Sequence, residues 1–162
     1  MGEPGRPASC RAWIRASWNI PSAWAGLLVF APSLAAYIPT LLPGVGYGGD
    51  TAKFQFLGGV LGIGHPTGYP LYLLLNWAFG HLPVGDLAYR ANLLSAVLGA
   101  LAAALLVPAL ERTGIGTWLS AVGALLFAFS YTEWSQAVVA EVYTLHAAFL
   151  AAALWTLLDW GE

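Results

Sequence analysis

The chain contains few charged residues, a single cysteine and no strongly basic stretch. Only 9% of its 162 residues are charged, whereas a soluble domain carries about 25%. The formal net charge of −2 provides no cationic stripe of the kind that nucleic-acid-binding proteins use, which excludes nucleic acid as a partner. A lone cysteine, Cys10, forms neither an internal disulfide nor a zinc site, and we expect no metal centre.

Apolar residues take the place of the missing charge. The chain is 59% hydrophobic with a mean hydropathy of +0.69. A helix needs about 20 apolar residues to cross a bilayer, and four stretches approach that length: 22–42, 87–110, 115–131 and 137–159. We therefore expect an all-α, polytopic transmembrane bundle over residues 21–160, in contact with lipid and preceded by a disordered tail over 1–20.

The distribution of arginine predicts the orientation of this bundle. Arg6, Arg11 and Arg15 precede the first stretch, so the positive-inside rule puts the N-terminus in the cytoplasm. The loop 43–86 then lies on the extracytoplasmic side. The same arginines and the SLAA sequence at 33–36 also fit a signal peptide, although the apolar length of the first stretch favours a retained helix.

The outer loop is predicted to hold two short helices. Residues 50–61 form an amphipathic stretch expected to lie along the membrane surface, and 69–82 is too short to span and reads as an interfacial or re-entrant helix. Asp50 at the start of the first helix is a suitable N-cap, which predicts that its carboxylate accepts the Lys53 backbone N–H.

Two prolines stiffen the connection between these helices. In GIGHPTGYP at 62–70, Pro66 and Pro70 restrict the residue before each of them, so His65 and Tyr69 are expected to be extended. A second polar turn, YTEWSQ at 131–136, is expected at the interface with Trp134 as a membrane anchor.

Small residues recur at every fourth position along two of the predicted spans. Such stripes let transmembrane helices pack closely. The stripes are Ala91, Ser95, Gly99, Ala103 and Ala140, Thr144, Ala148, Ala152.

Four motifs taken together resemble a known family. They are DTAKFQF from Asp50, GHPTGYPLYLLL from Gly64, AYRANLLSA from Ala88 and WSQAVVAEVYTLH from Trp134. As a set they resemble the transmembrane-protein-260-like protein O-mannosyltransferases, formerly a domain of unknown function, over about 22–160. The acid followed by a His-Pro turn is more distantly similar to other protein O-mannosyltransferases and to lipid A aminoarabinose transferases. All of these are polytopic glycosyltransferases of the GT-C class.

The resemblance implies a catalytic role for one acid. In GT-C enzymes an essential acid lies in the first extracytoplasmic loop, the position that Asp50 holds here. The implied role is that of a general base: Asp50 takes the proton from an acceptor hydroxyl of a protein or glycan while the oxygen attacks the sugar. The sugar, mannose in this family, would come with inversion from a polyprenyl-phosphate donor, with no other cofactor.

The resemblance also implies a substrate-binding set. The leaving polyprenyl phosphate needs cationic partners, for which Arg90, with Lys53 or His65, is the candidate; the alternative for Arg90 is snorkelling to the interface with an ion pair to Asp86. Glu141 is an ionisable residue near the outer end of the last predicted span, where such a residue suggests function. Tyr69 and Tyr143 complete the set, whereas His146, deeper in the membrane, is interpreted as structural.

Some residues depart from the family pattern. Thr51 stands where protein O-mannosyltransferases have a second acid, Lys53 stands where many closer members have Glu, and Thr67 replaces a proline. The first two differences argue against a two-acid or metal-assisted arrangement within this loop, whereas Thr67 is a milder change that leaves the turn in place.

The family context leaves several expectations. Family members run to several hundred residues, so we expect an N-terminal module whose remaining polypeptide is missing. The richness in Ala, Gly, Leu and Trp indicates a bacterial plasma membrane. The alternatives are a non-catalytic lipid-carrier-binding or transport subunit, and a structural bundle that needs a partner.

Overall fold

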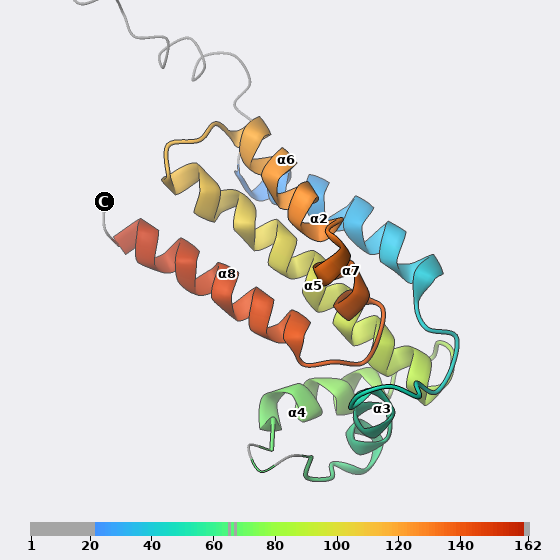
Figure 1. The fold of residues 1–162 in the computed structure, drawn as a ribbon. Coiled ribbons are helices and arrows are strands. Elements are labelled where there is room, and N and C mark those ends of the chain that lie inside the picture. Colours follow the sequence, from blue (N-terminus) through green and yellow to red (C-terminus); the bar gives the residue numbers. More distant parts are fainter. Residues whose placement is uncertain (1–21, 65, 67, 161–162) are drawn as a thin grey trace, which may run out of the picture.

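The computed structural model describes residues 22–64, 66 and 68–160, and every regular element in these ranges is a helix (Figure 1). The elements are α2 (Ser22–Tyr37), η1 (Ile38–Thr40), α3 (Thr51–Val60), α4 (Pro70–Phe79), α5 (Leu87–Arg112), α6 (Thr117–Ala128), α7 (Tyr131–Ala137) and α8 (Tyr143–Trp160). The all-α class is thus confirmed. The predicted disordered tail lies outside the described residues.

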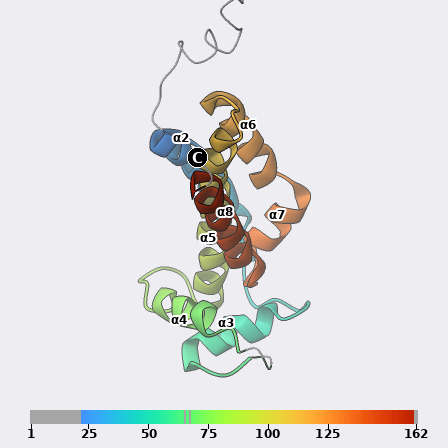
Figure 2. The ribbon, with the colours of Figure 1, turned by 90° about the vertical axis from the view of Figure 1, so that its left-hand side faces the viewer.

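The long helix α5 is the centre of the bundle, and α2, α6 and α8 pack around it (Figures 1 and 2). The two predicted small-residue stripes line this packing. Ser95 and Gly99 on α5 and Thr144 on α8 are buried, and a Cβ at Gly99 would lie 3.5 Å from the Thr144 methyl carbon. Small side chains therefore allow α8 to approach α5 closely.

Only part of the predicted span pattern agrees with the structure. Two described helices are long and apolar enough to cross a membrane, Ser22–Thr40 and Leu87–Arg112. The predicted span 115–131 contains instead a helix of 12 residues, Thr117–Ala128.

The predicted span 137–159 is broken. The chain leaves α7 at Ala137 and re-enters a helix only at Tyr143. Three valines in this linker, residues 138–142, have modest helix propensity. Tertiary bonds replace helical ones there: the Val138 carbonyl accepts the Leu42 N–H at 3.0 Å, and the Glu141 N–H donates to Ser95 Oγ at 3.2 Å.

Helices α3 and α4 lie together at the end of the bundle where α5 begins (Figures 1 and 2). Their bounds agree closely with the predicted 50–61 and 69–82. The rings of Phe54 and Tyr72 meet edge-on at 5.2 Å, and the Asn76 amide donates to the Phe54 carbonyl at 2.7 Å. A Cβ at Gly58 would come within 2.4 Å of the Asn76 side chain, so glycine is what permits this crossing.

The interfacial interpretation of the 131–136 turn is wrong for Glu133. Glu133 is only 7% exposed, because α7 folds back onto α5 at Gly99. Trp134 points toward α2 as well: its indole N–H donates to Thr40 Oγ1 at 3.2 Å, and its ring contacts Tyr37 edge-on at 5.4 Å.

Candidate functional site

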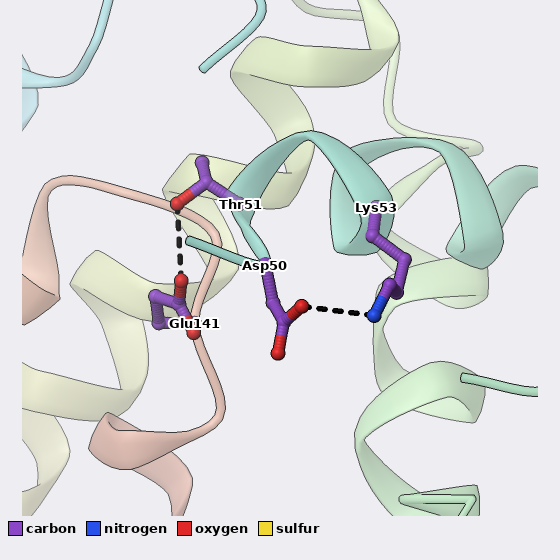
Figure 3. A network of polar contacts seen from close by, with 4 residues as sticks. All are labelled: Asp50, Thr51, Lys53 and Glu141. Atoms are coloured by element: carbon purple, nitrogen blue, oxygen red, sulfur yellow. Dashed lines mark hydrogen bonds and ion pairs between the residues drawn. The ribbon is translucent and has the colours of Figure 1, made fainter. Parts of the chain in front are cut away.

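Two acidic residues that are far apart in the sequence lie close together at the end of the bundle where α5 begins (Figure 3). Asp50 lies at the start of α3, and Glu141 lies in the linker between α7 and α8. The Thr51 hydroxyl donates to Glu141 Oε1 at 3.1 Å, and Lys53 Nζ contacts Asp50 Oδ1 at 2.9 Å. The cluster therefore joins two acids, a hydroxyl and a cation.

Asp50 occupies the N-cap position of α3, but its carboxylate makes no capping hydrogen bond. The predicted bond to the Lys53 backbone is therefore wrong. Asp50 has φ −95° and ψ 1°, outside the extended region from which a side chain normally reaches back to the first turn. The carboxylate instead pairs with the Lys53 ammonium, and it is 35% exposed.

Glu141 is fixed by its backbone. Its N–H donates to Ser95 Oγ at 3.2 Å, and Ser95 donates in turn to the Glu141 carbonyl at 3.3 Å. Burial raises the pKa of the Glu141 carboxyl, the nearby Asp50 charge raises it further, and the hydrogen bonds from Thr51 and the Asp50 backbone oppose this shift. Glu141 thus holds a proton more readily than an exposed glutamate.

The pair is suited to proton transfer. Two neighbouring carboxyl groups whose surroundings differ can take different roles in proton transfer. Asp50, paired with Lys53, is the group suited to accept a proton, and Glu141 is suited to donate a hydrogen bond. The local sequence argued against two acids because Thr51 follows Asp50. The second acid comes instead from the 138–142 linker: the sequence singled out Glu141 as a candidate, but no local signal placed it beside Asp50.

Arg90, the predicted phosphate ligand, does not join the cluster of Asp50, Lys53 and Glu141. Its guanidinium donates to three backbone carbonyls of the loop between α4 and α5: Val84 at 2.7 Å, Gly80 at 2.7 Å and Gly85 at 2.8 Å. Donors that hold this loop are not available to a phosphate in this arrangement.

The start of α5 explains this placement. Asp86 is its N-cap and accepts the Tyr89 N–H at 2.8 Å, rather than pairing with Arg90 as the alternative interpretation of Arg90 expected. Residues two apart on a helix point about 200° apart. Because Asn92 faces Gln55 of α3, Arg90 points away from that contact, and the structure does not bring it to Asp50.

Tyr69, another predicted substrate-binding residue, lines a nearby cleft. Tyr69 has φ +43° and ψ 50°, so the extended conformation predicted from Pro70 is wrong; an edge-on contact with Phe54 at 5.8 Å accompanies the left-handed backbone. Tyr143, the first residue of α8, is 60% exposed. His65 lies outside the described residues.

This cleft has a volume of about 270 Å³ and a mostly apolar lining. Its walls come from the start of α4 and the start of α8. They are formed by Tyr69, Pro70, Leu71, Tyr72, Val142, Leu145, His146 and Phe149. His146, interpreted from the sequence as structural, is therefore part of a cleft wall.

Three polar residues beside the site were not predicted. Gln55 and Asn92 were not singled out, and Ser95 was expected only to aid packing. All three are buried. Their polarity within otherwise apolar helices is the signal that could have identified them, because buried polar side chains need partners. Among the described residues, no three His, Cys, Asp or Glu side chains gather as a metal site would require.

Comparisons with known proteins give the family. The model of the protein O-mannosyl-transferase TMEM260 N-terminal domain matches residues 50–162. The chain is 34% identical over 150 residues to protein O-mannosyl-transferase TMEM260 of Mus musculus, covering 92% of this chain and 21% of the relative. It is 26% identical over 132 residues to protein O-mannosyl-transferase tmem260 of Dictyostelium discoideum, covering 80% of this chain and 16% of the relative.

No solved structure matches the chain. The chain spans about a fifth of the length of these relatives. Both relatives are eukaryotic, so they lend no support to the expected bacterial origin. The family model covers most of the sequence, including Asp50, Lys53 and Glu141. The chain belongs to the family of the protein O-mannosyl-transferase TMEM260 N-terminal domain.

Proposed function

We propose that this chain forms the base-bearing end of a membrane-embedded GT-C glycosyltransferase. The enzyme transfers a sugar, mannose by analogy with the relatives' names, from a polyprenyl-phosphate donor to a hydroxyl of a protein or glycan. The reaction takes place at the extracytoplasmic face, with the N-terminus in the cytoplasm. The observation that carries the proposal is the meeting of Asp50, Lys53 and Glu141 at one end of the bundle.

The proposed step is a single displacement with inversion. The acceptor oxygen forms a bond to the anomeric carbon while the bond from that carbon to the phosphate oxygen breaks. The Asp50 carboxylate takes the hydroxyl proton, and the electron pair of the broken bond leaves with the polyprenyl phosphate. Removing such a base typically lowers the rate about 10²–10⁴-fold.

The other members of the cluster have supporting roles in this proposal. Lys53 Nζ, 2.9 Å from Asp50 Oδ1, orients the carboxylate and supplies positive charge beside the departing phosphate. Glu141, with its raised pKa, donates a hydrogen bond to the sugar or the acceptor.

Replacement of Asp50 by asparagine tests the proposal. In full-length protein in detergent, with labelled polyprenyl-phosphate mannose and an acceptor peptide bearing hydroxyls, we expect D50N to lower kcat about 10²–10⁴-fold. Expression and gel-filtration behaviour should be retained, because Asp50 makes no capping bond.

Asp86→Asn is the matched control. Asp86 caps α5, and asparagine caps a helix about as well as aspartate, so this variant should transfer sugar normally. A D50N protein that also transferred sugar at the normal rate would exclude Asp50 as the base.

The second candidate is a non-catalytic subunit that binds a lipid carrier, which the apolar cleft between α4 and α8 favours. This function predicts that labelled polyprenyl phosphate binds equally to the unsubstituted protein and to D50N, with no transfer by either. Detectable transfer by the unsubstituted protein decides in favour of the enzyme.

A further inference from the structure

Two buried carboxamides hold the segment that leads to Asp50. Residues 41–49 contain no helix, yet three of their backbone groups are bound by Gln55 of α3 and Asn92 of α5. Gln55 Oε1 accepts the Gly46 N–H at 3.0 Å, and Gln55 Nε2 donates to the Gly44 carbonyl at 3.2 Å. Asn92 Nδ2 donates to the Leu42 carbonyl at 2.9 Å.

The two carboxamides also bind each other. Gln55 Nε2 donates to Asn92 Oδ1 at 2.9 Å, and the two residues are 3% and 0% exposed. A carboxamide accepts and donates at the same time, which neither a carboxylate nor an apolar side chain does. The pair therefore matches the alternating N–H and carbonyl groups of the backbone that it holds.

The same contacts connect this segment to the other half of the site. The Leu42 N–H donates to the Val138 carbonyl at 3.0 Å, and Val138 begins the linker that carries Glu141. Three residues after Asn92 on α5, Ser95 binds the Glu141 backbone. One face of α5 thus holds both segments that supply the carboxylates.

The segment needs such support because it is rich in glycine. Four of its nine residues are glycine, which gives the unrestrained backbone a high conformational entropy. A Cβ at Gly46 would lie 2.6 Å from the Thr51 methyl carbon, so the backbone passes directly against the residue that binds Glu141. A shift of this segment would therefore move Thr51 and its neighbour Asp50.

We propose that Gln55 and Asn92 are positioning residues for the transfer reaction, and that they set the place of Asp50 relative to Glu141 through the 41–49 segment. This inference rests on the proposed function, in which Asp50 is the base. Both side chains are buried, so they act through the segment that they hold rather than by contact with substrate. A displacement of about 1 Å at a reacting group can lower a rate about 10²-fold.

The test compares two buried asparagines in the full-length protein. Asn92→Asp keeps the size and the acceptor toward Gln55, and in its ionised form it loses the donor to Leu42. Asn92→Leu removes both. The matched control is Asn76→Leu, since Asn76 is also 0% exposed and binds a backbone carbonyl, that of Phe54, without contacting the 41–49 segment.

We expect N92D and N92L to lower kcat about 10²-fold with an unchanged KM for polyprenyl-phosphate mannose. In the D50N background they should cause no further loss, because the base they position is already absent. N76L should lower thermal stability yet change kcat less than N92D does. An N92D variant with normal kcat, or a loss that multiplies with that of D50N, would overturn the inference.

A spin-label distance separates this inference from the proposed function. In a Cys10→Ser background, spin labels are placed at Tyr47→Cys and Tyr131→Cys, whose native residues are 104% and 88% exposed. Double electron–electron resonance then measures the distance between the 41–49 segment and α7. N92D and N92L should broaden the distance distribution, and N76L should not. An unchanged distribution in N92L refutes the positioning role even if Asp50 proves essential; broadening with normal transfer by D50N refutes only the proposed function.

Discussion

Glu133 is a carboxyl group in the interior of the bundle. Its Oε1 has no hydrogen-bond partner among the described residues, and neither does the buried hydroxyl of Thr144. A Cβ at Gly99 would lie 2.9 Å from this oxygen, so the carboxyl group lies directly on α5. It belongs to α7, outside the two helices long enough to span a membrane. Burial raises the pKa of Glu133 to about 7.

This raised pKa predicts a pH-dependent stability. The folded protein binds a proton at Glu133 more tightly than the unfolded chain, whose pKa is 4.5. The stabilisation is therefore complete below about pH 4.5 and is lost as the pH rises through about 7. Since one pKa unit corresponds to about 1.4 kcal/mol, the free energy of unfolding falls by at most about 3–4 kcal/mol up to pH 8. We expect the Tm, followed by tryptophan fluorescence in detergent, to fall between pH 5 and pH 8.

Glu133→Gln should flatten this dependence, because a carboxamide does not ionise. The variant should exceed the unsubstituted protein in Tm at pH 8 and differ less at pH 5. Parallel pH curves for the two proteins would show that Glu133 does not titrate in this range.

At the scale of elements, α5 organises the molecule. Its face with Asn92, Ser95 and Gly99 contacts the 41–49 segment, the linker and α7 in turn. Along this face the helix exchanges hydrogen bonds with irregular backbone, which is how a bundle rich in alanine and leucine satisfies the polar groups of its non-helical segments. The packing of α2, α6 and α8 against α5 relies on the small residues of α5, which let the helices approach closely.

Gly99→Leu tests this dependence. The new side chain would meet Glu133 Oε1 at 2.9 Å and Ala137 Cβ at 3.1 Å, and overpacking of this kind costs about 1–3 kcal/mol. Gly123→Leu is the matched control, because glycine at 123 is also within a helix and a Cβ there meets only Leu110, at 3.3 Å. We expect a lower Tm for G99L alone. Equal Tm values would mean that α7 adjusts without loss.

At the scale of the whole molecule, the candidate site and the Arg112–Asp159 ion pair lie at opposite ends of α5. The helix has 26 residues, a length of about 39 Å at 1.5 Å per residue. That exceeds the hydrocarbon thickness of about 30 Å. We therefore expect the two ends of α5 to lie at opposite faces of a membrane.

Cysteine labelling in sealed vesicles checks this arrangement. In a Cys10→Ser background, Tyr47→Cys and Thr113→Cys lie at opposite ends of the bundle, and both residues are exposed. A membrane-impermeant maleimide should label one position in intact vesicles and the other only after permeabilisation. Labelling of both positions from the same side would contradict a spanning α5.

The sequence alone determined the all-α class and the approximate places of most helices, but it predicted a turn where α7 (Tyr131–Ala137) is a helix. Apolar length indicated 22–42 and 87–110, and the amphipathic run 50–61 and the short apolar run 69–82 indicated α3 and α4, because these signals are local. The motifs around Asp50 and Glu141 also carried the family, which the comparisons then established.

Only the tertiary structure decided how these parts meet. It placed Glu141 beside Asp50, broke the last predicted span at 138–142, and directed Arg90 to the loop carbonyls rather than to the acids. Each outcome depends on a partner distant in sequence, whether Ser95 for the linker or Gln55 for the 41–49 segment. Buried polar groups take the partners that the packed helices bring within reach, and that choice is made only when the chain has folded.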